Sequence, residues 1–154
     1  MGARAIAGGL AVVGLLAACG DEPVAPLFPA GYASTYGEVR ACRRSADHDL
    51  GQIRVLADPA AAGPYVARDA AFPVGATLLK VEYDFGDLDC TGPIRNWTVM
   101  QRAAEGGEPL QLGWAWQRVE PDRTVTSEND SRCLGCHARC GVAPDGYLGT
   151  CAVP

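Results

Sequence analysis

Apolar and polar side chains alternate along several short segments of the chain. The clearest case is the segment Ala76–Phe85, in which alternate residues fall on two faces. A period of two residues predicts a β-strand. One face carries Thr77, Leu79, Val81, Tyr83 and Phe85, and the other carries Ala76, Leu78, Lys80, Glu82 and Asp84. Similar runs, separated by turns that include Gly92-Pro93 and Glu105–Pro109, predict strands at Ile53–Leu56, Asn96–Arg102 and Leu112–Val119.

Two segments have helical patterns. Thr35 and Glu38 resemble a capping box, and apolar residues then recur at helical spacing, so we expect a helix over Thr35–Ala46. Ser131 is expected to cap a short helix near the C-terminus. Gly63-Pro64 should limit Ala60–Ala71 to a loop with one helical turn. The expected fold is mainly β (α+β), with an antiparallel sheet, an N-terminal helix and a C-terminal helix.

The N-terminus resembles a bacterial export signal. Arg4 precedes an apolar run, Ala5–Ala18, that is shorter than the roughly 20 residues needed to span a membrane. Leu16-Ala17-Ala18-Cys19 resembles a lipobox, so residues 1–18 are expected to be a signal peptide and Cys19 to carry lipid. The expected location is the periplasmic side of the cell envelope, anchored to the membrane. An ordinary signal peptide with an incidental Cys19 is the alternative.

A proline-rich segment follows this signal. Residues 19–31 contain three prolines and predict an extended, poorly packed tether. Residues 32–154 are then expected to form one domain, since about 120 residues suffice for a single core. The formal net charge of −5 gives no reason to expect nucleic-acid binding and would suit a basic redox partner.

Cys133, Cys136 and His137 form a C-x-x-C-H motif, which is typical of covalently attached c-type haem. The two thiols would each bond a haem vinyl group, and His137 would bind the iron. A thioredoxin-like site is a poor alternative because only 17 residues follow His137. A zinc site that also uses Cys140 is less suitable, since adjacent Cys136 and His137 fit one tetrahedral ion badly.

Four further cysteines remain after lipid and haem are assigned. An even number in an oxidising compartment predicts two disulfides, for which three connectivities exist. We favour Cys140–Cys151, which closes a short loop, and Cys42–Cys90, which would tie the first helix to a strand end. Four free thiols are the alternative.

Together these segments resemble the cytochrome P460 family and its relatives, the β-type cytochromes c′. The matching pieces, in order, cover about Tyr32 to Tyr147 and are Phe72–Val81, Trp97–Arg102, Gly113–Trp116 and Cys133–His137. The resemblance implies a mainly β domain with one haem c, His137 as proximal iron ligand and an open opposite face. It also implies binding or conversion of nitric oxide or hydroxylamine, and a possible homodimer.

The resemblance assigns a role to Lys80, the only lysine in the chain. In P460 proteins a lysine at the matching position is linked to the haem ring. The family's catalytic carboxylate aligns near Thr98, where this sequence has no acid, so hydroxylamine oxidation lacks its expected proton acceptor. Glu82, Glu105 or Glu108 would replace it only under a different alignment.

His48 and Met100 are the candidate sixth iron ligands. Either one would make the protein a six-coordinate periplasmic electron-transfer cytochrome, which is the alternative function. His48 lies between two aspartates at the end of the expected helix, which favours an exposed turn. Met100 lies on an expected strand, where a methionine usually belongs to the core.

Overall fold

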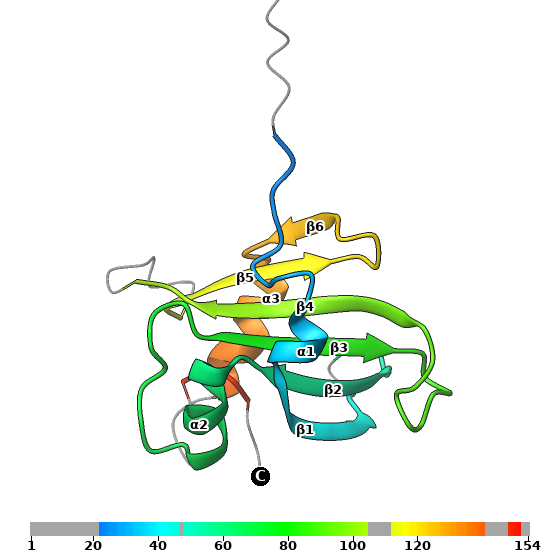
Figure 1. The fold of residues 1–154 in the computed structure, drawn as a ribbon, viewed down its shortest axis with the longest axis horizontal. Helices are drawn as coiled ribbons and strands as arrows, with labels where there is room; N and C mark the ends of the chain where they lie inside the picture. Colours follow the sequence, from blue (N-terminus) through cyan, green and yellow to red (C-terminus); the bar gives the residue numbers. More distant parts are fainter. Residues whose placement is uncertain (1–21, 47, 105–111, 141–147, 152–154) are drawn as a thin grey trace, which may run out of the picture.

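A six-stranded antiparallel sheet forms the centre of the molecule, with strands in the order β1-β2-β3-β4-β5-β6 (Figure 1). The computed structural model describes residues 22–46, 48–104, 112–140 and 148–151. The strands are β1 (Gly37–Arg44), β2 (Gln52–Ala57), β3 (Thr77–Tyr83), β4 (Ile94–Arg102), β5 (Trp114–Val119) and β6 (Val125–Glu128). The helices are α1 (Tyr32–Thr35), α2 (Pro59–Ala67), α3 (Ser131–His137) and the 3₁₀ turn η2 (Ala138–Cys140). The predicted mainly β, antiparallel fold is confirmed.

Both faces of the sheet are covered, because β3 buries side chains on each side. Leu79, Val81 and Tyr83 pack with Phe28 and Trp97 on one face. The opposite face packs with α2 and α3 and contains Val55, Ala57, Ala61, Tyr65, Phe72, Ala76, Leu78, Met100, Trp114 and Trp116. The alternation predicted for this strand therefore separates two cores. Within the described residues, no helix is long and apolar enough to cross a membrane.

The predicted helix over Thr35–Ala46 is wrong. Only Tyr32–Thr35 is helical, and Gly37–Arg44 is the edge strand β1, paired with β2. Val39 packs in one core and Cys42 in the other, because residues three apart in a strand lie on opposite faces. Their three-residue spacing thus reflects a strand with two contact faces, not one face of a helix.

The predicted tether is too long. The amide of Leu27 donates to Gln117 Oε1 at 2.8 Å, and Phe28 is 2% exposed beneath the Arg123 guanidinium. The packed part of the chain therefore begins before Tyr32. Burial of Phe28 against the sheet outweighs the extended tendency of its neighbouring prolines.

Segment Pro59–Ala67 is a helix, where only one helical turn was predicted. The Asp58 carboxylate caps it by accepting from the Ala61 amide at 2.7 Å, and Pro59 occupies the first turn, where its missing N–H costs nothing. Ala61 and Tyr65 anchor the helix in the core despite the internal Pro64. The short edge strand β6 was also not predicted. The predicted turn at residues 105–109 lies outside the described residues.

Candidate functional site

Helix α3 carries the C-x-x-C-H motif against the sheet. Its N-cap is Asp130, whose carboxylate accepts from the Arg132 amide at 2.8 Å, one residue earlier than the predicted cap at Ser131. Cys133 and Cys136 both have free thiols, partly buried and exposed respectively. Burial, followed by the charge of Asp130, raises the pKa of the Cys133 thiol. The motif cysteines lie one helical turn apart, as attachment of a porphyrin at two points requires.

His137 ends α3 as a buried imidazole, 7% exposed, packed edge-on against Trp116. Its Nδ1 lies 2.5 Å from the carbonyl oxygen of Gly149, so Nδ1 must carry the proton and donate it. Burial lowers the pKa of His137 to about 4, which keeps the ring neutral at pH 7. This tautomer leaves a lone pair on Nε2, the arrangement that a metal-binding histidine needs.

A cavity of about 150 Å³ lies between α3 and the sheet. It adjoins a second hollow of about 390 Å³, and Lys80 and His137 line both. The apolar part of the lining comes from Val55, Tyr65, Leu78, Met100 and Trp116. The apolar walls suit a haem ring. The two thiols and the neutral imidazole of α3 are the donor groups that a c-type haem needs.

The sheet contributes a charged cluster to the wall of this cavity. Lys80 and Glu82 are two residues apart on β3, and Lys80 pairs across the sheet with Thr98 of β4. Thr98 Oγ1 donates to Glu82 Oε1 at 3.2 Å. His48 contacts both charged residues, through Nε2 to Lys80 Nζ and through Nδ1 to Glu82 Oε1 at 3.4 Å.

Glu82 is held as a carboxylate by its neighbours. Burial raises its pKa, but a hydrogen bond and charge from His48 and the charges of Lys80 and Arg118 outweigh burial, so the net pKa lies below its usual value. With its amide oriented to satisfy both neighbours, Asn96 donates to Glu82 Oε2 at 3.2 Å and accepts from Arg118 at 3.1 Å. The wall of the cavity therefore contains an ionised, hydrogen-bonded carboxylate at Glu82.

The structure gathers most of the candidate residues around this cavity. Lys80, Thr98, Cys133, Cys136 and His137 all line it. Met100 is part of the wall and of the core, 8% exposed.

The exposed turn predicted for His48 is wrong, because its side chain is only 23% exposed and lies in the cavity. The element before His48 is the strand β1, so the helix-end argument does not apply.

Glu82 is the residue that the sequence reasoning undervalued. The family resemblance places the carboxylate near Thr98, and Glu82 replaces it only under a different alignment. Its position two residues after Lys80 in an alternating strand places both side chains on the same face. This two-residue spacing is the sequence signal that could have identified Glu82 as part of the site.

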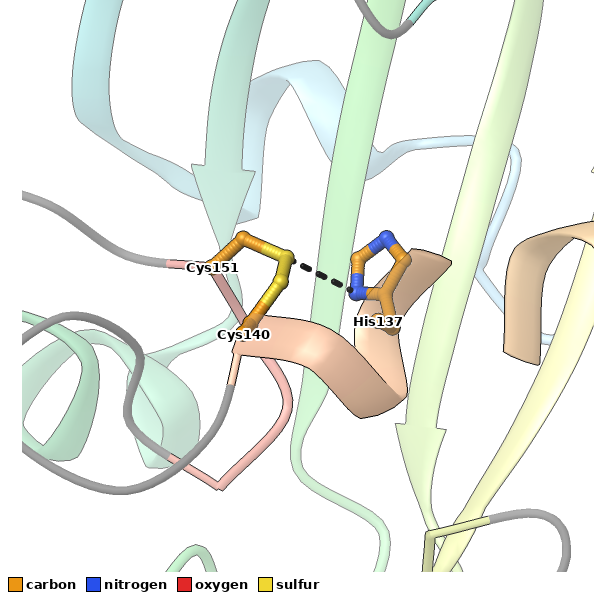
Figure 2. Close-up of side chains that lie close together, drawn as sticks. All are labelled: His137, Cys140 and Cys151. Carbon is orange, nitrogen blue, oxygen red and sulfur yellow. Dashed lines mark hydrogen bonds between the residues drawn. A yellow bond between two sulfur atoms is a disulfide. The ribbon is translucent and has the colours of Figure 1, made fainter. Parts of the chain in front are cut away.

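Two disulfides join the remaining cysteines, Cys42–Cys90 and Cys140–Cys151, the pairs favoured from the sequence. Cys42 lies on β1, not on a helix. Cys140 and Cys151 cluster with His137 (Figure 2). Because their sulfurs are bonded to each other, this cluster has no thiolate for a metal, and Cys140 is not a zinc ligand.

Comparison with known proteins gives one clear result. No curated protein matches the chain. The family model for Cytochrome P460 matches residues 29–143, which include the sheet, the charged cluster and helix α3. The chain therefore belongs to the cytochrome P460 family of haem-binding cytochromes.

Proposed function

We propose that the protein is an exported c-type cytochrome that carries one covalent haem and binds or converts nitric oxide or hydroxylamine at an open iron position. One observation carries this proposal above the others. His137 is a buried neutral imidazole whose Nδ1 proton is committed to Gly149, and it lines the same cavity as the Lys80–Glu82 pair. The cavity thus combines an imidazole nitrogen suited to bind iron with a charged cluster on another wall.

Three residues of α3 would hold the cofactor. Cys133 and Cys136 would supply the thioether sulfurs, and His137 Nε2 would bind the iron. When bound, the haem supplies an iron centre that binds small nitrogen compounds and exchanges electrons with them. The apolar residues around the cavity would exclude bulk water from the iron.

Glu82 and His48 are suited to move the proton that such chemistry releases. The Glu82 carboxylate is ionised and lies in the cavity, so it is the group that would accept a proton from a bound nitrogen compound. His48 Nδ1 is 3.4 Å from Glu82 Oε1, and its side chain is partly exposed, which gives the proton a path to solvent. Thr98 would orient the carboxylate by its hydrogen bond.

Electron transfer with His48 as sixth iron ligand is the second candidate, because His48 lines the cavity. Against it, both ring nitrogens of His48 already contact Lys80 and Glu82. Met100 lines the cavity too, but it is only 8% exposed and packs as part of the core. The open-site function is therefore better supported.

Optical spectra of the purified haem protein separate the two functions. The open-site proposal predicts a high-spin spectrum in both oxidation states that changes on addition of nitric oxide. A low-spin spectrum that nitric oxide leaves unchanged would establish the electron-transfer alternative.

Export and anchoring rest on the N-terminal sequence alone, since residues 1–21 lie outside the described residues. We infer a lipid-modified Cys19 from the lipobox. Cys19→Ser should move the protein from the membrane fraction to the soluble periplasmic fraction. Retention in the membrane would contradict lipid attachment.

A further inference from the structure

The last described residues, Leu148–Cys151, form a short segment beside His137, here called the C-terminal strap. Its Gly149 carbonyl accepts the His137 Nδ1 proton. Among the described residues, two contacts that hold the strap are a hydrogen bond from the Trp114 indole to the Leu148 carbonyl, at 2.9 Å, and the disulfide between Cys151 and Cys140 of the turn that follows α3 (Figure 2). The strap also lies beyond residues 29–143, the part that matches the family.

The strap has a backbone conformation that needs support. Leu148, Gly149 and Cys151 have φ values of 49°, 76° and 52°, in the left-handed region. For a residue with a side chain this region costs about 1–3 kcal/mol and persists only when the surroundings enforce it. Without its attachments the strap would relax, and the Gly149 carbonyl would leave its position against His137.

The disulfide is close enough to act on the histidine directly. Cys151 Sγ lies 3.6 Å from His137 Nδ1, so the bond that anchors the strap also packs against the ring (Figure 2). An acceptor on the Nδ1 proton makes the imidazole a stronger electron donor through Nε2 and fixes the ring orientation. A stronger donor stabilises ferric over ferrous iron and lowers the reduction potential.

We propose that the Cys140–Cys151 disulfide is a positioning element for the iron ligand: it holds the C-terminal strap so that Gly149 keeps the His137 proton and the haem potential stays low. This inference rests on the proposed function, in which His137 binds the haem iron. The Cys42–Cys90 disulfide joins β1 to the loop after β3, where Cys42 and Cys90 belong to the opposite core. It has no comparable contact with His137 among the described residues.

The test compares two double variants of the haem-loaded protein, Cys140→Ser/Cys151→Ser and Cys42→Ser/Cys90→Ser. The readouts are the haem midpoint potential, from an optical redox titration, and the iron–histidine stretching frequency of the ferrous form, from resonance Raman spectroscopy. We expect the first variant to have a higher potential and a lower stretching frequency than wild type. The second should match wild type in both.

Two results would overturn the inference: wild-type values in Cys140→Ser/Cys151→Ser, or equal shifts in both variants. If that variant does not accumulate, Trp114→Phe removes the hydrogen bond to the Leu148 carbonyl and should also raise the potential. An unchanged potential in Trp114→Phe would then count against the strap. A wild-type protein without covalent haem would instead refute the proposed function.

Discussion

Lys80 is the residue whose chemistry most distinguishes this site. It projects from β3 into the cavity, contacts His48, and lies within reach of the charge of Glu82. A half-buried lysine is costly unless its amine is used or reaches water. Its surroundings are therefore consistent with a functional amine, as the family resemblance implies.

If Lys80 is linked to the haem, the wild-type protein should have a markedly red-shifted haem band. Lys80→Ala should lose this shift while retaining haem, because Cys133, Cys136 and His137 remain. Lys80→Arg is the matched control, since it preserves the charge but not the amine. Identical spectra for wild type and Lys80→Ala would remove Lys80 from the site.

Glu82→Gln tests the charged cluster. The substitution leaves Lys80 and Arg118 without their buried anionic neighbour, so we expect a loss of about 1–3 kcal/mol in unfolding free energy at pH 7. The folded pKa of Glu82 lies below 4.5, so its contribution is full above about pH 4.5 and is lost as the pH falls through the folded pKa.

Denaturant titrations of wild type and Glu82→Gln at several pH values would measure this difference. The gap between the two proteins should narrow only below pH 4.5. A gap that is constant with pH would mean that the Glu82 charge does not stabilise the fold.

For single residues, the sequence predicted which residues line the cavity better than it predicted the contacts between their side chains. The motif residues Cys133, Cys136 and His137 line the cavity, and Lys80 lies on the strand that its pattern predicts. The contact between His48 and Glu82 joins a loop to β3, and no periodicity encodes such a contact. Thr98, chosen by alignment, instead serves as a donor to the carboxylate that the alignment missed.

At the scale of the elements, the side chain of Asp58 connects helix α2 to strand β3 by hydrogen bonds. The Asp58 carboxylate accepts from the Ala61 amide at the start of α2 and from the Thr77 amide at the start of β3. Helix α2 contributes Tyr65 to the cavity wall, so this capping residue also supports the site.

Asp58→Ala should lower the unfolding free energy by about 1–2 kcal/mol, because it removes a helix cap and leaves the Thr77 amide without its carboxylate acceptor. Asp69→Ala changes an exposed aspartate just after α2 and is the control, expected within about 0.5 kcal/mol of wild type. Chemical denaturation measures both. Equal effects of the two substitutions would contradict the capping role.

The strands with alternating apolar and polar residues were predictable from the sequence, whereas the edge strands β1 and β6 were not. Neighbouring residues of β3 pack in opposite cores, whereas Val39 and Cys42 of β1 have a three-residue spacing that also suits a helix. The pairing of β1 with β2 decides its conformation, and that pairing is a tertiary interaction that local sequence does not encode.

For the whole molecule, the two disulfides have separable roles. Cys42–Cys90 closes a sequence separation of 48 residues, and Cys140–Cys151 one of 11. On chain-entropy grounds their removal should cost about 4 and about 3 kcal/mol respectively. We therefore expect Cys42→Ser/Cys90→Ser to be the less stable double variant, although the other one should alter the haem potential.

Denaturant titration of both double variants under oxidising conditions measures which of them has the lower free energy of unfolding. If Cys140→Ser/Cys151→Ser proved much the less stable, its changed potential would be explained by general loosening of the fold.

The central claim is that one haem is bonded to the chain through Cys133 and Cys136, with His137 on its iron. A pyridine haemochrome assay tests it most directly, on mature protein made with the cytochrome c maturation machinery and extracted with acidified acetone. We predict a c-type spectrum, one haem per chain, and haem that stays with the polypeptide. Haem that extracts into the solvent, or a colourless protein, would contradict the account.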